Sequence, residues 1–140
     1  MLYEDYVKKM DEIATSEISP DEKRERRLAL KEQTHRELQV GDGVTVCLWS
    51  DRHAGTIIKR TPKTIVIQED KATLSPDFKP EFSIGGFCAH CTNQSEQSYT
   101  YEKDEKGSVY TARWSEKRKR FVCYDKVVML GRHKFHDYNF

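Results

Sequence analysis

The sequence lacks several features that would place the protein in a well-defined class. It contains no run of about 18 apolar residues, which a membrane-spanning helix would need. Its acidic start, residues 1–5, has neither the basic nor the apolar region of a secretion signal. We therefore expect a soluble, intracellular protein.

The chain also lacks a strong excess of charge. Its 24 lysines and arginines nearly balance 23 aspartates and glutamates, so the net charge is +1. Residues 1–39 carry 8 basic and 10 acidic groups, whereas residues 40–140 carry 16 and 13. A non-specific nucleic-acid binder usually has a dense basic face and a high isoelectric point. The composition argues against binding to long nucleic acids and suits a small anionic ligand held by a few arginines.

Common catalytic signatures are missing as well. There is no Gly-rich phosphate loop followed by Lys-Ser or Lys-Thr, no GxSxG and no HExxH. His90 and Cys91 could act as base and nucleophile, with His53 nearby, but adjacent residues on a strand point to opposite faces. We therefore expect no catalysis and keep an enzyme built on these three residues as an alternative.

Cysteine is scarce, and its spacing is a weak metal signal. The four cysteines include one CxxC pair, Cys88 and Cys91. Structural zinc needs four converging ligands, so Cys47, His53 or Cys123 would have to join that pair through folding. Reduced intracellular cysteines are commonly small buried hydrophobes. We expect neither a metal nor a cofactor.

The pattern of residues 1–39 predicts two helices. Leu2, Tyr6, Met10 and Ile13 share one helical face. The sequence 19–22, Ser-Pro-Asp-Glu, combines an N-cap, a first-turn proline and a capping box, and predicts a second helix to about residue 39.

The second helix is almost wholly charged over residues 21–27, so it cannot be deeply embedded in its own domain. We expect residues 1–39 to form an oligomerisation arm that packs against another copy of the chain. A helical hairpin that lies on its own barrel is the open alternative.

Residues 40–140 have the period-two pattern and turn residues of a β-rich ligand-binding domain. We expect strands over residues 44–48, 54–60, 63–69, 97–102, 108–114 and 121–130, and a long loop over residues 70–92. The predicted fold class is α+β: a two-helix arm followed by a small antiparallel barrel or meander of the SH3-like kind. The aromatic tail, residues 132–140, should dock on the protein.

The densest polar segment is residues 82–101, which interleaves rings, amides and a histidine around a Gly-Gly pair. Rings can stack on a purine, amides can pair with base edges, and arginines can grip phosphate oxygens bidentately. The candidate ligand-binding residues are Phe82, Asn93, Arg113, Arg60, Phe87, His90, Gln94 and Trp49.

Each candidate also has a structural explanation. The phenylalanines could belong to a turn and fill the protein core, while the polar groups of that turn face water. Trp49 and Trp114, on strands, are more often core residues than ligand platforms. Residues 117–120, Lys-Arg-Lys-Arg, suit a solvated hairpin turn better than a nucleic-acid patch.

Several segments resemble small proteins of Firmicutes phages and prophages, more specifically the first Thoeris anti-defence family of phage nucleotide sponges. The segments are Leu48-Trp49-Ser50-Asp51-Arg52-His53-Ala54-Gly55, Lys79-Pro80-Glu81-Phe82, Gly85-Gly86-Phe87, His90-Cys91, Asn93-Gln94 and His136-Asp137-Tyr138-Asn139-Phe140. The resemblance covers about residues 40–140.

The resemblance implies a non-catalytic protein, in the cytoplasm of an infected bacterium, that sequesters cyclic ADP-ribose isomers made by the Thoeris immune system. Some members of that family also bind CBASS cyclic oligonucleotides at separate sites, and the resemblance implies a homo-oligomer, a dimer or hexamer, built through the helices. Onto this chain it transfers Phe82, Asn93 and Arg113, with Arg60 as a weaker candidate. The alternative function is an SH3-like phage module that binds a host protein or nucleic acid.

Overall fold

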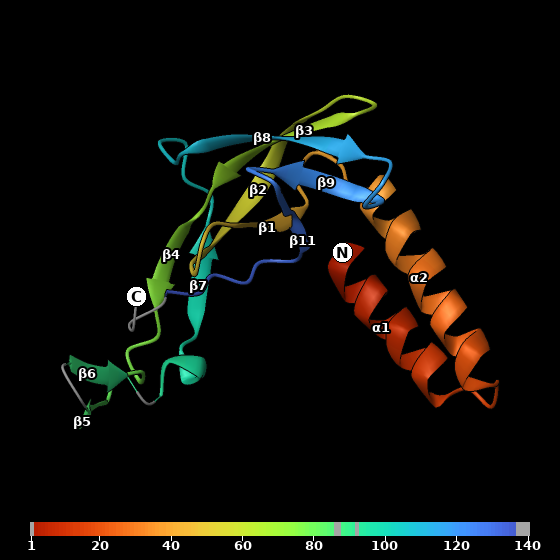
Figure 1. The fold of residues 1–140 in the computed structure, drawn as a ribbon. Helices are drawn as coiled ribbons and strands as arrows, with labels where there is room; N and C mark the ends of the chain where they lie inside the picture. Colours follow the sequence, from red (N-terminus) through yellow and green to blue (C-terminus); the bar gives the residue numbers. More distant parts are fainter. Residues whose placement is uncertain (1, 86–87, 92, 137–140) are drawn as a thin grey trace.

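The structure is a computed structural model that describes residues 2–85, 88–91 and 93–136; for 82–85 and 88–91 it describes the backbone only. Two N-terminal helices are followed by an antiparallel, nearly closed, barrel-like sheet, so the fold class is α+β (Figure 1). The elements are α1 (Leu2–Thr15), α2 (Pro20–Arg36), β1 (Gly43–Cys47), β2 (Arg52–Arg60), β3 (Thr64–Glu69), β4 (Lys71–Leu74), β5 (Phe82–Gly85), β6 (Cys88–Cys91), the 3₁₀ turn η1 (Gln94–Glu96), β7 (Tyr99–Glu102), β8 (Val109–Ser115), β9 (Arg120–Cys123), β10 (Lys126–Val127) and β11 (Met129–Leu130).

Both helices form where the sequence predicts them. The Ser19 hydroxyl caps α2 by accepting a hydrogen bond from the Glu22 backbone N–H at 3.2 Å, with Pro20 as the first helical residue. Such a cap typically contributes about 1 kcal/mol. The helix ends at Arg36, three residues earlier than expected. Within the described residues, no helix is both long and apolar enough to cross a lipid bilayer.

Seven strands form the main sheet in the order β10, β9, β8, β3, β2, β1, β11. The two edge strands, β10 and β11, are consecutive in the chain and are separated only by Val128. Because Val128 is buried and its N–H donates to the Phe121 carbonyl, the sheet curls until its edges lie close together. This geometry makes the sheet barrel-like rather than open.

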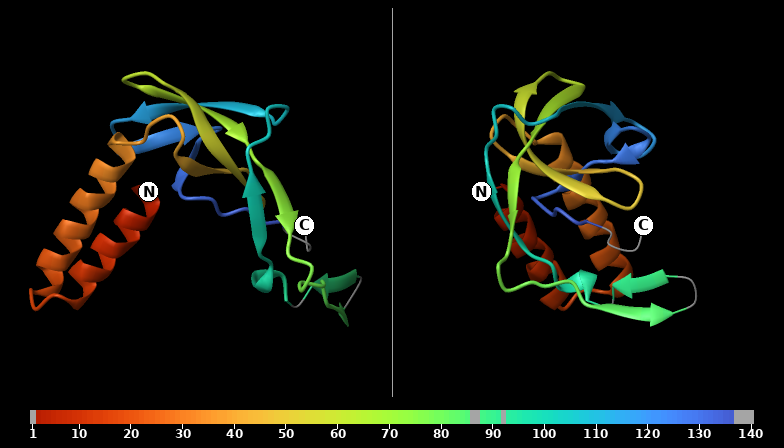
Figure 2. Two further views of the ribbon diagram at one scale, coloured as in Figure 1. Left: turned by 180° about the vertical axis from the view of Figure 1, so that it is seen from behind. Right: turned by 90° about the vertical axis from the view of Figure 1, so that its left-hand side faces the viewer.

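The core fills the inside of this curled sheet. It consists of Leu38, Val44, Val46, Ile57, Ile65, Ile67, Ala112, Phe121, Cys123, Val128 and Leu130. Three residues of α1, Leu2, Tyr3 and Tyr6, pack against the same cluster. The helical hairpin therefore lies against one end of its own sheet, and Figures 1 and 2 show the rest of it extending away from the strands.

The alternation predicted for β1 fails at Thr45, which is fully buried between two buried valines. Its hydroxyl donates to the Gly131 carbonyl and accepts from the His133 N–H, both at 2.8 Å. Segment 131–136 therefore covers the outer face of β1. Part of the aromatic tail docks on the protein as expected, whereas residues 137–140 lie outside the described residues.

The prediction of a long loop over residues 70–92 is wrong, because this range contains β4, β5 and β6. β4 follows β3 directly and pairs with β7 as a two-stranded ribbon, and β5 pairs with β6 as a hairpin. Figures 1 and 2 show this hairpin at the end of the ribbon that is far from the main sheet. Local sequence does not reveal β4, because its partner lies about 28 residues further along the chain and pairing is a tertiary effect.

Candidate functional site

The sequence-predicted site residues fall into two separate regions. Phe82, Asn93 and Gln94 belong to the far hairpin and the turn beside it, with His90 in β6. The side chains of Phe82 and His90 and the whole of Phe87 lie outside the described residues. The remaining candidates, Arg60, Arg113 and Trp49, come from the main sheet and its β1–β2 turn.

The side-chain amide of Asn93 is used to hold the chain together. Its Oδ1 accepts from the Glu81 N–H at 2.7 Å, and its Nδ2 donates to the Lys79 carbonyl at 2.8 Å. Gln97 behaves likewise, donating to the Gln94 and His136 carbonyls and accepting from the His136 N–H. Both amides therefore join separate backbone segments through hydrogen bonds, which leaves few of their donor and acceptor positions for a ligand.

Arg60 caps the end of α2. Its Nε donates to the Leu38 carbonyl and its Nη2 to the Arg36 carbonyl, both at 2.8 Å. Its guanidinium also lies over the Phe121 ring, 4.8 Å from the centroid. A cation near the C-terminal carbonyls of a helix is favourable. The geometry gives Arg60 a helix-anchoring role.

Arg113 and Trp49 are both exposed. Arg113 lies on β8 opposite Thr64 and Val122, and the next residue, Trp114, packs edge-on against Phe121. Trp49, a ligand-binding candidate, is 92% exposed at the β1–β2 turn, so the alternative explanation that it is a strand residue of the core is wrong. One chain does not bring Arg113 next to Asn93, because the ribbon separates the hairpin from the main sheet (Figure 1).

A different group of residues surrounds a hollow between the helices and the sheet, which we call the cationic hollow. Its volume is about 290 Å³, and backbone segment 127–130 forms part of its wall. Its polar and aromatic lining residues are Tyr3, Tyr6, Lys31, His35, Arg120 and His133. None of the described residues that line it is acidic.

The two cations of this hollow, Lys31 and Arg120, form no ion pair with an acidic group of the described residues. Among the described residues, neither the Lys31 side chain nor the Arg120 side chain has a hydrogen-bond or ion-pair partner, although both residues are half-buried. Glu32, which lies beside both in an adjoining hollow, pairs with Arg36 at 3.1 Å. By contrast, the neighbouring Arg118 pairs with Asp125 at 3.2 Å and Lys119 with Glu116 at 3.1 Å. Unpaired charges that are partly removed from water are costly, so the arrangement favours an added anion.

His35 lies at the buried side of the same hollow. It is 2% exposed, and its Nδ1 is buried without a hydrogen-bond partner. Burial, and then the charges of Arg120 and Lys31, lower the pKa of His35 to about 4. Burial and the charge of Arg120 also lower the pKa of Lys31. At neutral pH the imidazole is therefore uncharged.

Tyrosine rings complete the wall. Tyr3 packs edge-on against the His133 ring with centroids 5.2 Å apart, and it lies 6.4 Å from the Tyr6 ring. The pKa of the Tyr6 hydroxyl is raised by burial, so it stays protonated and can donate a hydrogen bond. The hollow therefore combines ring faces, hydroxyl groups and cations.

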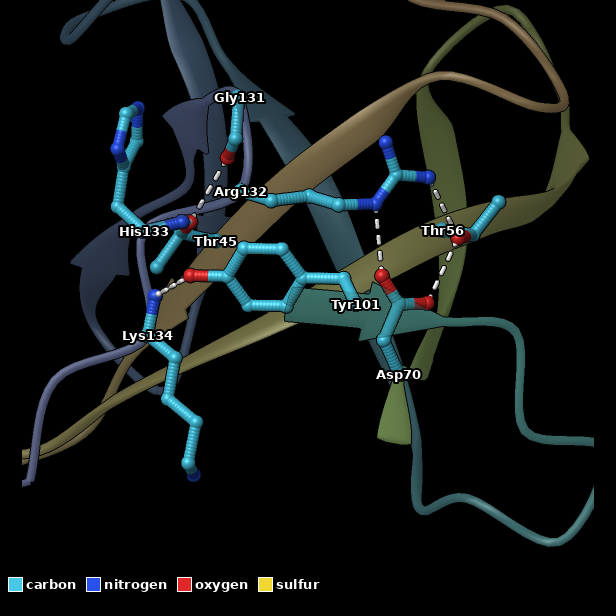
Figure 3. A network of polar contacts seen from close by, with 8 residues as sticks. All are labelled: Thr45, Thr56, Asp70, Tyr101, Gly131, Arg132, His133 and Lys134. Carbon is cyan, nitrogen blue, oxygen red and sulfur yellow. Dashed lines mark hydrogen bonds and ion pairs between the residues drawn. The ribbon is translucent and has the colours of Figure 1, made fainter. Parts of the chain in front are cut away.

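A polar network fixes the segment that carries His133 (Figure 3). The buried Asp70 accepts from Arg132 Nε at 2.7 Å and from the Thr56 hydroxyl at 2.7 Å, and Arg132 Nη2 reaches the same hydroxyl at 2.9 Å. Gly131 precedes this contact with a φ of +77°, a conformation that favours glycine. The network therefore fixes Arg132, the residue before His133, to Thr56 of β2 and to Asp70.

Sequence reasoning missed the cationic hollow because its residues lie far apart in the chain. Tyr3 belongs to α1, Lys31 and His35 to α2, and Arg120 to β9. The one available signal was the run at residues 117–120: residues 117–119 form the expected turn, but Arg120 begins a strand beside the buried Phe121.

The CxxC pair stays untested as a metal site, because the side chains of Cys88 and Cys91 lie outside the described residues. No three His, Cys, Asp or Glu side chains among the described residues converge on one point. Burial raises the pKa of both the Cys47 and Cys123 thiols; Cys123 is buried and Cys47 is half-buried. His53 lies in β2 with its Nδ1 2.8 Å from Glu69 Oε1.

Comparisons with known proteins return no match to the chain, whether against family models, curated proteins or solved structures.

Proposed function

We propose that the protein binds a small anionic nucleotide in the cationic hollow and retains it without chemical change. The observation that carries the proposal is the set of uncompensated positive groups, Lys31 and Arg120, beside tyrosine rings and an unpartnered His35. An anion would supply the missing counter-charge. The rings would supply a surface for a base.

The chemistry of the lining suits this ligand class. Arginine can hold a phosphate through two parallel hydrogen bonds, and lysine adds a point charge. Stacking of a base on an aromatic side chain contributes about 1 to 3 kcal/mol. The volume of about 290 Å³ is near the lower limit for small-molecule pockets. We therefore expect part of the ligand to remain exposed to solvent.

For the biological ligand we propose the cyclic nucleotide immune signals implied by the resemblance: cyclic ADP-ribose isomers of Thoeris, or cyclic oligonucleotides of CBASS. Withholding such a signal in the infected cell requires tight binding rather than turnover, which favours preorganised contacts over an activated nucleophile. The role is that of a phage anti-defence sponge without cofactor.

We also propose that the helical hairpin joins copies of the chain into a dimer or hexamer. Val7 on α1 and Leu28 on α2 are exposed. The two helices carry opposite charge, because α1 has two lysines and four acidic residues and α2 has six lysines and arginines and four acidic residues. Antiparallel pairing of two hairpins would place α1 of one copy against α2 of the other.

A second candidate function rests on Trp49. A tryptophan that is 92% exposed at a turn is typical of a binding hot spot. With a barrel that we propose to be of the SH3-like type, supported by the β1–β2–β3 meander and the short closing strands, it favours a module that binds a host protein. Loss of partner binding on Trp49→Ala would support this alternative.

The test is incubation of the purified protein with cyclic ADP-ribose isomers and cyclic di- and trinucleotides, followed by re-isolation, heat release and chromatography. Recovery of intact ligand from wild type, but not from Arg120→Met, would support the proposal. Arg113→Met is the matched control, because it removes an exposed arginine from the adjacent strand. An altered product would indicate an enzyme, and no retention of any compound would refute the proposal.

If Arg113→Met abolishes retention while Arg120→Met does not, the ligand lies at the residues transferred by the resemblance and the cationic hollow is not the site. Since β8, which carries Arg113, and the far hairpin beside Asn93 lie at opposite ends of the ribbon (Figure 1), a pocket that used both residues would then lie between two copies. Light scattering would give the number of copies.

A further inference from the structure

The cationic hollow contains a titratable group whose charge depends on what occupies the hollow. His35 is faced by Lys31 of its own helix and by Arg120 of β9, whose side chains have no partner among the described residues. α1 contributes Tyr3 and Tyr6, and the segment after β11 contributes His133. None of the described lining residues carries a negative charge.

In the empty hollow every surrounding influence opposes a charged imidazole. Burial removes water from the ring, and two cations lie close to it. The Nδ1 atom has no hydrogen-bond partner that would stabilise a proton there. An anion between Lys31 and Arg120 would reverse the electrostatic part of this balance.

We propose that anion binding in the cationic hollow is coupled to the uptake of one proton by His35, so that affinity for a phosphate or sulfate group rises as the pH falls. The proton comes from the solvent and forms an N–H bond on the imidazole, and the ligand is not altered. The inference rests on the proposed function only in using the same hollow, because it concerns the anionic group and not the nucleotide.

The coupling reaches its upper limit if the bound anion offsets the effect of burial as well as that of the two cations and restores an ordinary histidine pKa of about 6.5. Starting from a pKa of about 4 in the empty protein, linkage predicts binding about tenfold tighter at pH 5.5 than at pH 7.5. Nearly one proton is then taken up per anion at pH 5.5. A site of fixed charge would show neither effect.

Inorganic sulfate is the suitable probe, because its own charge does not change between pH 5.5 and 7.5. Calorimetric titration in buffers of different ionisation enthalpy measures both the affinity and the number of protons taken up. For wild type we expect tighter binding at pH 5.5 than at pH 7.5, by up to about tenfold, together with proton uptake. Equal affinity at the two pH values, or no proton uptake, would overturn the proposal.

Two variants locate the proton. His35→Asn should bind sulfate with little pH dependence. His133→Asn, which removes the other histidine of the hollow, should retain the pH dependence of wild type. A His133→Asn protein that loses the dependence would overturn the assignment to His35. If His35→Asn does not fold, the ¹³C shift of the His35 ring in wild type decides, because it must report protonation at pH 5.5 only when sulfate is bound.

The two proposals can fail separately. Retention of a cyclic nucleotide that is equally tight at both pH values, with no proton uptake on sulfate binding, would support the proposed function and refute the coupling. Proton-coupled sulfate binding without retention of any cyclic nucleotide would do the reverse.

Discussion

The hairpin end and the cationic hollow contrast in what their polar groups do. At the hairpin end, the Asn93 amide bonds backbone at residues 79 and 81, and the Gln97 amide bonds backbone at residues 94 and 136. In the hollow, Lys31 and Arg120 have no partner among the described residues. The segment of the sequence that is richest in polar groups is therefore the one whose described amides bind backbone groups of the protein itself.

This difference shows why a count of polar residues along the chain is a weak guide to a binding site. Amides beside irregular backbone readily satisfy that backbone, because unpaired N–H and C=O groups are costly to bury. A charged group that folding leaves unpaired in a hollow has no such structural task. It therefore points more directly to a ligand.

The largest effect should come from breaking the network that fixes Arg132, the residue before His133. Asp70→Asn leaves Arg132 without its counter-charge, and disruption of a buried ion pair costs about 3 to 5 kcal/mol. We expect a loss of that order in the free energy of unfolding, measured with urea. Asp125→Asn breaks the exposed pair with Arg118 and should cost less than about 1 kcal/mol. Equal losses in the two variants would contradict a structural role for the network.

Burial of His35 in the unliganded protein should also make the free energy of unfolding depend on pH. Because the pKa of His35 is lowered to about 4 on folding, the unfolded chain binds the proton more readily between pH 6.5 and 4. Stability is therefore retained above pH 6.5 and is lost as the pH falls through this window, by about 3 kcal/mol. Urea unfolding of wild type and His35→Asn at pH 7.5 and 4.5 measures this loss. The same loss in both proteins would assign it to other groups.

Removal of Lys31 should separate binding from stability. Lys31→Met deletes a charge that burial and Arg120 both oppose, so the empty protein should be as stable as wild type or slightly more stable. Ligand affinity should fall about tenfold, as expected for loss of one charge-assisted contact. Lys119→Met, whose lysine is paired with Glu116, is the matched control and should leave affinity nearly unchanged. A large fall in melting temperature for Lys31→Met would show that Lys31 has a structural role, as the amides of the hairpin end do.

The smallest effect should come from the hairpin end. Asn93→Ala removes two hydrogen bonds to backbone, and we expect a loss of about 1 kcal/mol with little change in nucleotide affinity. Faster hydrogen exchange at the Glu81 amide would report the loss locally. A greatly weakened affinity with unchanged exchange would instead restore Asn93 as a ligand contact.

Part of the fold could be predicted because its causes are local. The α2 cap depends on Ser19, Pro20 and Glu22, which are adjacent in sequence. The alternation of Ile65 and Ile67 with their neighbours similarly identifies β3. β4 could not be found in this way, since its short mixed sequence forms a strand only through pairing with β7.

The candidate site, like the fold, could be predicted from the sequence only in part. From the residues alone, a pocket with rings and cations for an anionic ligand was a reasonable prediction, and Arg60 was a reasonable member of it. The structure instead uses Arg60 to hold the carbonyls of Arg36 and Leu38. No local pattern distinguishes an arginine that caps a helix from one that is left free for a ligand.

By itself, the sequence determined the two helices, most strands of the barrel and the near balance of charge, because caps, period and composition act over a few residues. Only the tertiary structure decided which cations remain unpaired. Lys31, His35 and Arg120 meet through the packing of α2 on β9, and burial sets their protonation only after they have met.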